Sequence, residues 1–305
     1  MDAVIQVESL TKRFGSLVAV DGVSFEVQRG EVFGILGPNG AGKTTTLECV
    51  EGLQKHDAGR VLVLGVDTRQ ETSKVKNHIG IQLQASAYFD YLTLLEILEL
   101  FGGFYQRRVA PMDLLERVGL VEKARTTVNK LSGGQKQRFT IAASLVNDPE
   151  VLFLDEPTTG LDPQARRQIW DFVRSIHKEG RTVVLTTHYM EEAQFLCHRV
   201  AIMDHAKIVA LDTPANLVHR LPVPYEVHLT CACALPEAEL KGLAGVHGVG
   251  RENGTYKLQI SEPTQVLPTL IDWAKANGIK LDHLEVVSAT LEDVFLSITG
   301  RQLRD

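Results

Sequence analysis

The sequence has few cysteines and no long apolar run. Its 305 residues include four cysteines, none of which forms a CxxC pair or a spacing typical of zinc sites: Cys49, Cys197, Cys231 and Cys233. We therefore predict reduced thiols in the protein interior rather than disulfides or a metal site. Nowhere do about 18 apolar residues follow one another, and the first residues lack a basic region followed by an apolar one, so we expect neither a membrane span nor an export signal.

An excess of basic residues is also absent. The net charge is −6 and the pI is near 5.9, so the chain as a whole does not attract phosphate backbones or anionic lipid, and nucleic acid is not an expected partner. Hydrophobic residues make up 44% and charged residues 23% of the sequence, which is ordinary for a soluble globular protein and excludes a disordered or fibrous chain. The length fits a main domain with a smaller second one.

Sheet and helix patterns alternate over the first 220 residues. Residues 5–7 and 23–27 alternate apolar and polar side chains, which predicts half-buried strands, and the apolar run 32–36 predicts a buried one. Helical spacing follows over 43–50. Further strand signals, separated mainly by helical stretches, lie at 61–64, 151–154, 182–185 and 200–203. This order is typical of an α/β fold with parallel crossovers. We predict one domain over residues 1–220, with a helical insert at about 86–146.

A segment with two prolines, Leu221-Pro222-Val223-Pro224, ends this pattern and predicts a linker, because it cannot continue a helix or an interior strand. Beyond it the patterns predict a strand, a helix, a hairpin, a helix and a strand, at 225–230, 236–243, around 252–254, 263–276 and 280–287. The order βαββαβ suggests a small ferredoxin-like sheet. We predict an α+β accessory domain over residues 221–305.

A glycine-rich loop stands between a predicted strand and a predicted helix. It fits G-x-x-x-x-G-K-[ST] and is followed by Thr45; its residues are Gly37, Pro38, Asn39, Gly40, Ala41, Gly42, Lys43 and Thr44. In this pattern backbone N–H groups surround phosphate, lysine reaches the β and γ phosphates, and Thr44 offers its hydroxyl to Mg²⁺. The helix start adds free N–H groups and a positive dipole end. The loop predicts ATP and Mg²⁺ as ligands; the alternative is a plain glycine-rich turn.

Two carboxylates directly follow the apolar run 151–154. Ligand chemistry in parallel sheets lies at the carboxyl ends of strands. We predict that Asp155 holds Mg²⁺ and that Glu156 orients or deprotonates the attacking water. Without the phosphate loop, an acidic turn before Pro157 would explain the pair equally well.

Two adjacent glycines lie in the segment Leu131-Ser132-Gly133-Gly134-Gln135. Ser132 and Gln135 have the spacing of a capping box at a helix start, which needs no ligand. A capped helix start with two glycines is also an anion site. The capping and anion-site interpretations are compatible with each other. A generic phosphate-loop protein has no reason to carry this motif.

Five motifs, GPNGAGKTT, LSGGQKQR, VLFLDEP, GLDP and the histidine after TVVLTT, occur in the order of the ABC ATPase family. Residues 4–220 resemble that family, which implies a P-loop NTPase core with an antiparallel β-subdomain and a helical insert. The resemblance further implies that two subunits, as a homodimer or heterodimer, enclose two ATP molecules. Each ATP would lie between one subunit's phosphate loop and residues 132–135 of the other.

The resemblance assigns roles to individual residues. Ser132, Gly133 and Gly134 would contact the γ-phosphate held by the partner subunit, and Asp162 would cross the dimer interface. His188 would contact the γ-phosphate, although a lone histidine at a strand end is usually structural.

Two further assignments come from the same resemblance. Gln84 resembles the glutamine that senses Mg²⁺, but the family's preceding proline is Leu83 here and Gln82 lies nearby. Phe14 stands where the family places an aromatic ring against adenine; the alternative is a hydrophobic residue tucked under the first sheet.

The last segment, Ser288 to Leu296, resembles ATPase subunits of the drug-resistance and antibiotic-export branch. Thr290 is placed to cap a helix with an apolar stripe that must be buried: Leu291, Val294, Phe295 and Ile298. The resemblance implies an exporter of a drug, antibiotic or other hydrophobic or lipid-like cargo. Its separate transmembrane permease subunits would bind this chain at the cytoplasmic face of the membrane.

Two alternatives remain at this point. A soluble ABC ATPase acting on ribosomes or DNA would carry two ATPase halves or long coiled-coil insertions, and neither is present. A regulator with slow, incidental hydrolysis is disfavoured by Glu156.

Overall fold

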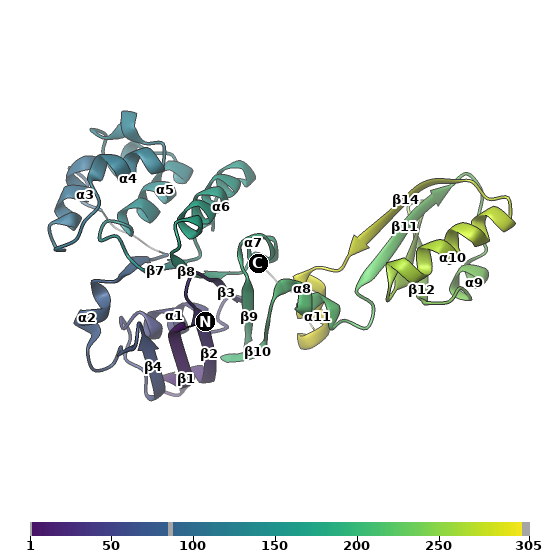
Figure 1. Ribbon diagram of the computed structural model, residues 1–305, viewed down its shortest axis with the longest axis horizontal. Helices are drawn as coiled ribbons and strands as arrows, with labels where there is room; N and C mark the ends of the chain where they lie inside the picture. The colour runs from purple at the N-terminus through teal and green to yellow at the C-terminus, as the bar shows by residue number, and fades with distance from the viewer. Residues whose placement is uncertain (1, 85–87, 301–305) are drawn as a thin grey trace. The chain divides into compact units, whose positions relative to one another are not determined.

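The structure, a computed structural model, describes residues 2–84 and 88–300 and divides into two compact units (Figure 1). Unit 1 runs to Pro214, and unit 2 begins at Ala215. The predicted boundary after residue 220 therefore lies inside unit 2, because helix α8 (Pro214–His219) belongs almost entirely to that unit. In the described residues no helix is both long enough and apolar enough to cross a membrane.

Unit 1 contains an antiparallel sheet with the order β2-β1-β4-β5. Its strands are β1 (Ala3–Phe14), β2 (Leu17–Gln28), β4 (Ala58–Val63) and β5 (Val66–Asp67). Along β2, burial follows the alternation seen in the sequence, with Val23, Phe25 and Val27 buried. One face of this sheet therefore packs on the core, as expected for an antiparallel sheet.

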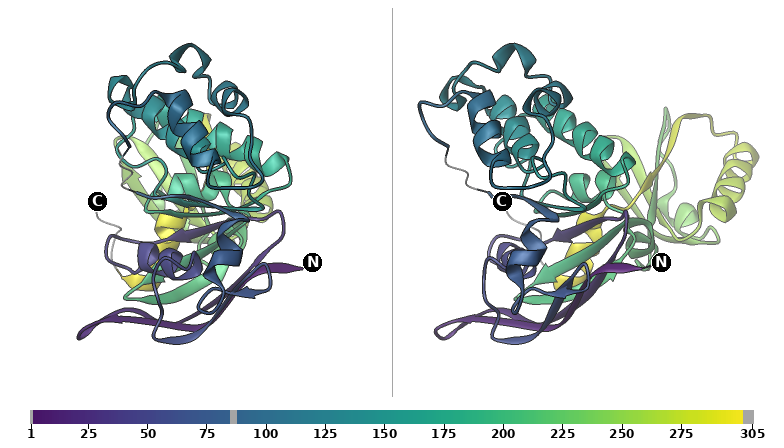
Figure 2. Two further views of the ribbon diagram at one scale, coloured as in Figure 1. Left: turned by 90° about the vertical axis from the view of Figure 1, so that its left-hand side faces the viewer. Right: turned by 60° about the vertical axis from the view of Figure 1, so that its left-hand side comes forward.

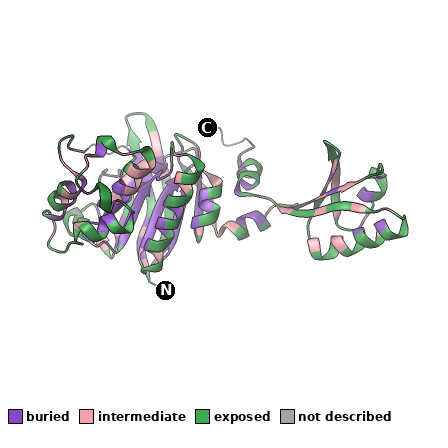
Figure 3. Cartoon of the chain, turned by 90° about the horizontal axis from the view of Figure 1, so that it is seen from above, coloured by how far each residue is buried: buried purple, intermediate pink, exposed green. Residues whose placement is uncertain are grey.

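The second sheet of unit 1 has six strands in the order β10-β9-β3-β8-β7-β6. All neighbours are parallel except β10 with β9. The strands are β3 (Val32–Leu36), β6 (Ile79–Gln82), β7 (Val151–Asp155), β8 (Thr182–Thr187), β9 (Arg199–Asp204) and β10 (Lys207–Asp212). Every residue of β3, β7 and β8 is buried, so their apolar runs are those of a sheet covered on both faces. Figure 3 shows this buried layer.

Helix α1 (Lys43–Val50) packs between the two sheets. Its Leu47 and Val50 belong to one cluster with Ile5 of the antiparallel sheet and Phe33 of the parallel sheet. The ring of Phe33 stacks on Phe25 with centroids 5.2 Å apart. Helix α1 is therefore packed against both sheets.

The helices α3 (Leu94–Gly102), α4 (Pro111–Arg117) and α5 (Gly133–Ala143) form a group beside the sheets (Figures 1 and 2). Two 3-10 turns, Val121–Lys123 and Val128–Lys130, connect α4 to α5. This group lies within residues 86–146, where a helical insert is expected; residues 86 and 87 lie outside the described residues. Unit 1 also contains α2 (Thr72–Lys76), α6 (Pro163–Lys178) and α7 (Met190–Leu196).

Unit 2 has a four-stranded antiparallel sheet with the order β12-β13-β11-β14. Its elements from the first strand onward are β11 (Tyr225–Cys231), α9 (Glu237–Lys241), β12 (Val246–Glu252), β13 (Thr255–Ile260), α10 (Pro263–Ala276), β14 (Leu281–Ser288) and α11 (Leu291–Thr299). The order from β11 to β14 is βαββαβ, as the pattern indicated. The likeness to ferredoxin-like domains stays a prediction. Asn253 and Gly254 have positive φ and make the tight turn of the hairpin.

Two details of the sequence analysis need correction. Cys233 is exposed and Cys231 only half-buried, because β11 ends at Cys231 and the strand alternation ends there. Cys49 and Cys197 are buried as expected, and burial raises the pKa of Cys49 to about 11. In α11, Thr290 forms the expected cap and the apolar stripe is buried except Ile298, which is 45% exposed.

Candidate functional site

The glycine-rich loop connects β3 to α1 in a conformation that requires glycine. Gly40 and Gly42 have φ of 80° and 100°, in the left-handed region that other residues rarely adopt. A Cβ on Gly42 would lie 2.3 Å from the carbonyl oxygen of Ala19, and one on Gly37 would lie 2.3 Å from that of Met203. The loop is therefore closely held by the antiparallel sheet on one side and by β9 on the other.

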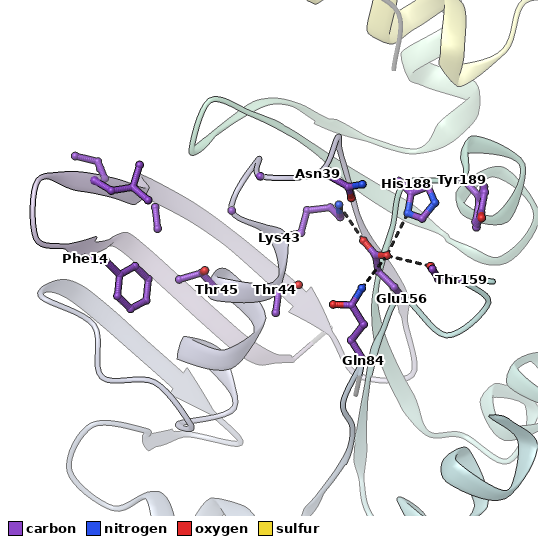
Figure 4. A pocket seen from close by; sticks show the side chains of 15 residues that line it. Phe14, Asn39, Lys43, Thr44, Thr45, Gln84, Glu156, Thr159, His188 and Tyr189 are labelled. Carbon is purple, nitrogen blue, oxygen red and sulfur yellow. Dashed lines mark hydrogen bonds and ion pairs between the residues drawn. The ribbon is translucent and has the colours of Figure 1, made fainter. Parts of the chain in front are cut away.

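A pocket of about 840 Å³ opens beside this loop (Figure 4). Figure 4 shows Phe14 at one end, Glu156 at the other, and Thr44 and Thr45 between them. The Phe14 ring is 45% exposed, so it is not tucked under the sheet. The lining residues are Phe14, Leu17, Val18, Ala19, Asn39, Gly40, Gly42, Lys43, Thr44, Thr45, Gln84, Glu156, Thr159, His188 and Tyr189.

Lys43 is a buried cation with three oxygen partners. Its Nζ donates hydrogen bonds to the carbonyl oxygens of Gly37 at 2.9 Å and Pro38 at 3.2 Å. The same nitrogen lies 3.2 Å from Glu156 Oε1, and both side chains are less than a tenth exposed. Buried charges are stable only when paired in this way.

The Glu156 carboxylate collects hydrogen-bond donors from separate parts of the chain. His188 Nδ1 lies 3.2 Å from its Oε2, and Thr159 and Gln84 donate to the same oxygen at 3.0 and 3.4 Å. The close contact with His188, the charge of Lys43 and the hydrogen bond from Thr159 lower the pKa of Glu156 to about 2. The carboxylate is therefore ionised at neutral pH.

Backbone contacts at the ends of β7 and β8 place the two carboxylates. Glu156 has a φ of 48°, which costs a non-glycine residue roughly 1–2 kcal/mol, and its N–H donates to Thr186 Oγ1 at 2.9 Å. Thr186 also donates to Asp155 Oδ1, which accepts a hydrogen bond from Thr44 at 3.1 Å. Burial raises the pKa of Asp155 despite these bonds. Gln82 donates to the Asp155 carbonyl oxygen at 3.3 Å, so this second glutamine supports the strand end.

The motif at residues 131–135 lies outside the pocket. Ser132 caps α5 with Gln135: Ser132 Oγ accepts from Gln135 N at 3.3 Å, and Gln135 Oε1 accepts from Ser132 N at 3.0 Å. Asp162 caps α6 by accepting from Ala165 N at 2.9 Å. A Cβ on Gly134 would lie 3.0 Å from Ala165 Cβ, so the two helix starts are adjacent. The capping interpretation is thus confirmed, and Ser132, Gly133 and Asp162 are exposed.

Several residues of the site were missed by sequence reasoning. Thr159 and Thr186 hold the carboxylates, and Tyr189 lines the pocket with its ring 4.1 Å from that of His188. A weak signal exists for two of them, because Thr159 lies shortly after the acidic pair and Thr186 lies at the polar end of β8, next to its last residue. Gln84, expected to sense Mg²⁺, donates a hydrogen bond to Glu156 Oε2 at 3.4 Å.

The sequence matches a family model described as ABC transporter over residues 20–159. The linearmycin resistance ATP-binding protein LnrL of Bacillus subtilis (strain 168) is 39% identical, with 99% of this chain and 100% of that protein aligned. The chain belongs to the ABC transporter family. Its similar proteins also include the Nod factor export ATP-binding protein I of Ralstonia nicotianae, 37% identical over 99% and 95% of the two chains. The daunorubicin resistance ATP-binding protein DrrA3 of Streptomyces coeruleorubidus is 37% identical over 99% and 98%.

Solved ABC cassettes have the same fold. A nucleotide-free ATP-binding cassette from an ABC transporter is 26% identical with a TM-score of 0.63, over 70% of this chain and 92% of that one. The dimeric post-hydrolysis cassette MJ0796 bound to ADP and Pi is 26% identical with a TM-score of 0.63, over 68% and 98%. This chain is therefore a nucleotide-binding ABC subunit and an ATPase.

A buried acid lies behind the nucleotide site of this ABC subunit. Glu51 caps the end of α1 and is 1% exposed, and within the described part of the chain neither of its carboxyl oxygens has a hydrogen-bond partner. Burial, followed by the charges of Asp155 and Glu48, raises the pKa of Glu51 from 4.5 to about 8. Between pH 4.5 and about 8, Glu51 keeps its proton in the folded chain and loses it in the unfolded chain.

We expect Glu51→Gln to remove a pH dependence of stability. As pH rises toward 8, deprotonation of Glu51 should lower the free energy of unfolding of the parent protein by up to about 1.4 kcal/mol per pH unit. Above pH 8 this contribution should level off. The E51Q variant should lack this slope, because an amide does not titrate. Urea unfolding from pH 6.5 to 9 measures the difference, with Glu99→Gln on the exposed face of α3 as control. Parallel pH profiles for E51Q and the parent would contradict the expectation.

Proposed function

We propose that this chain hydrolyses ATP as one half of a dimeric ATPase and powers export through separate permease subunits. The observation that carries the proposal is a pocket in which the phosphate loop, Lys43 and Glu156 converge, while the helix starts at Ser132 and Asp162 are exposed outside it. One chain therefore holds the two halves of an ATP site on different surfaces.

The shape of the pocket suits ATP. The adenine ring of ATP would lie against the exposed ring of Phe14, and its phosphates would lie along the glycine-rich loop toward Lys43. Lys12 Nζ lies 4.9 Å from the centroid of the Phe14 ring, so a cation already stabilises that ring. The main-chain N–H groups at the start of α1 and the helix dipole favour phosphate at the loop end.

The residues at the loop end fit Mg²⁺. A hydroxyl from Thr44 and a carboxylate from Asp155 lie 3.1 Å apart, and hard oxygen donors of this kind are the ligands that Mg²⁺ prefers. We infer that Thr44 and Asp155 hold the ion and that Gln84 joins them by turning its amide from Glu156. When bound, Mg²⁺ would neutralise negative charge on the phosphates.

The network around Glu156 supports hydrolysis. A phosphate would draw Lys43 from Glu156, and loss of that ion pair would raise the pKa of the carboxylate toward a value useful to a base. His188, 3.2 Å from Glu156, would then lie between the carboxylate and the γ-phosphate. Thr159 donates to the same carboxylate oxygen, Oε2, and keeps it oriented.

Dimer formation would complete the site. The capped start of α5, with Ser132 and Gly133 exposed, offers free N–H groups to a phosphate held by another subunit. Asp162 is exposed at the adjacent start of α6 and can reach a partner without losing its capping bond. A solved cassette that is dimeric and bound to ADP and Pi supports the proposal of a dimer, whether homodimer or heterodimer.

An apolar groove offers a docking surface for a permease. It lies between β6 and the helices α3 and α5, has a volume of about 490 Å³, and includes Leu53, Leu83 and Phe104, which are 45%, 43% and 73% exposed. Leu83 directly precedes Gln84, so a helix bound in the groove would adjoin the nucleotide site. We infer that an apolar helix of a membrane subunit binds here, at the cytoplasmic face of the membrane.

The cargo proposed for the complex follows the relatives named for linearmycin, daunorubicin and Nod factor. We propose export of a drug, antibiotic or other hydrophobic or lipid-like molecule. A soluble ATPase acting on ribosomes or DNA is not favoured by any observation on the structure.

We expect Phe104→Glu to release the permease and leave the chain's own ATPase intact. A charge in the apolar groove must be desolvated on docking, so recovery of a membrane protein with the tagged chain from solubilised membranes should fall at least 10-fold. Val209→Glu, at a 40% exposed residue of β10 outside the groove, is the matched control. Equal recovery with both variants, or recovery of ribosomes instead, would contradict the proposal.

A further inference from the structure

Glu192 is a fully buried carboxyl group beside the catalytic residues, with no part in the proposed chemistry. It lies in the first turn of α7 and is 0% exposed. Its Oε1 accepts a hydrogen bond of 2.9 Å from Trp170 Nε1 of α6, which is itself 3% exposed. Glutamate is almost never fully buried without such partners, because desolvating the group is costly.

The surroundings of Glu192 connect it to both sides of the catalytic network. The hydroxyls of Thr187 and Thr158 lie beside its carboxyl group, and each threonine is 1% exposed. Thr158 is two residues after Glu156, and Thr187 directly precedes His188. Neither Glu192 Oε2 nor Thr158 Oγ1 has a hydrogen-bond partner in the described residues. Glu192 therefore lies beside both segments, and its hydrogen bond connects α7 to α6.

A second contact connects helix α6 to the segment that carries His188. The Arg166 guanidinium carbon lies 4.0 Å from the ring centroid of Tyr189, whose ring contacts that of His188 at 4.1 Å. Arg166 and Trp170 are four residues apart on one face of α6. The segment that carries His188 and Tyr189 connects β8 to α7, so these contacts fix a stretch of chain that lies between regular elements.

We propose that Glu192 is a positioning residue for ATP hydrolysis, which fixes α7 to α6 and thereby holds His188, which precedes α7, against Glu156. The inference rests on the proposed roles of His188 and Glu156. Burial raises the pKa of Glu192, which favours the neutral acid. Glutamine has the same shape, an acceptor oxygen for Trp170 and donor hydrogens, so it should replace the acid.

Three variants test the proposed role of Glu192. Glu192→Ala should lower the rate of ATP turnover by about 10-fold, since small displacements of catalytic groups are costly, while KM for ATP stays within about twofold. Glu192→Gln should restore most of the lost rate. Glu191→Gln changes the exposed neighbour in the same helical turn and should have no effect. Unfolding temperatures of all variants show whether the fold is retained.

A double-mutant cycle with His188→Ala separates positioning from general damage. If Glu192 acts through His188, adding Glu192→Ala to His188→Ala should cause little further loss in single-turnover hydrolysis. An equal loss in both backgrounds, or no rescue by Glu192→Gln, overturns the inference about Glu192. Unchanged turnover in His188→Ala alone would instead overturn the proposed role of His188.

Discussion

Replacing Glu156 by glutamine is expected to lower ATP turnover by about 100-fold or more while ATP binding persists. The amide keeps the size of the side chain and an acceptor for Thr159, but it carries no negative charge and cannot accept a proton from water. Because Lys43 then has no carboxylate at 3.2 Å to compete with phosphate, affinity for ATP should not fall. The ATP-bound dimer should accumulate, since hydrolysis is the step that would end it.

Turnover is measured by phosphate release, ATP binding by calorimetry and dimer formation by size-exclusion chromatography with ATP and Mg²⁺. Glu150→Gln is a suitable control, because Glu150 precedes the same strand at its other end and is paired with Arg29. Near-normal turnover in Glu156→Gln would remove Glu156 from the catalytic role, whatever the control shows.

Replacing Lys43 by alanine is expected to weaken ATP binding by about 100-fold or more. Truncating one partner of a buried hydrogen-bonded charge pair across a binding interface costs about 2–5 kcal/mol of binding free energy, and each 1.4 kcal/mol is tenfold in affinity. The variant loses the cation that faces the phosphates and leaves Glu156, 8% exposed, without its ion pair. Without the lysine charge, the Glu156 carboxylate would then repel the γ-phosphate as well.

Calorimetric titration with ATP and Mg²⁺ measures this loss, and circular dichroism establishes that the variant is folded. Lys178→Ala, at the exposed end of α6, removes a lysine charge without touching the pocket. An unchanged affinity in Lys43→Ala would overturn the assignment of the loop as the phosphate site.

The two variants should be distinguishable by their opposite effects on the dimer. Glu156→Gln retains both halves of the proposed site and should trap two subunits with ATP between them. Lys43→Ala should give little ATP-dependent dimer, because nucleotide no longer bridges the phosphate loop and Ser132 of a second subunit. If both variants formed the dimer equally well, dimer formation would not depend on ATP binding.

Local patterns were sufficient for the main features of unit 1. The run 32–36, the glycine-rich loop and the start of α1 are neighbours in the chain, so strand, loop and helix could be predicted from spacing. The same is true of Asp155 and Glu156 after the apolar run of β7. Strand lengths were underestimated in β1 and β2, because the exposed ends of these antiparallel strands are stabilised by pairing and not by an apolar pattern.

Burial at strand ends and helix ends was harder to predict. Cys233 follows the alternation of β11 in the sequence, yet the strand stops two residues earlier and the side chain is exposed. Glu51 and Glu192 are charged residue types that the sequence would place on a surface. Both are buried, because the helices that carry them pack between other elements.

The sequence by itself determined that the chain is an α/β phosphate-loop protein with the motifs of an ABC ATPase, since these depend on residues close together in the chain. Tertiary structure decided which of those residues meet. Parallel pairing of β7 with β8 brings Thr186 opposite Asp155, and Lys43 reaches Glu156 from a distant part of the sequence. It also decided that Ser132 lies outside the pocket of its own chain. These outcomes depend on strand order and helix packing, which no local spacing of side chains specifies.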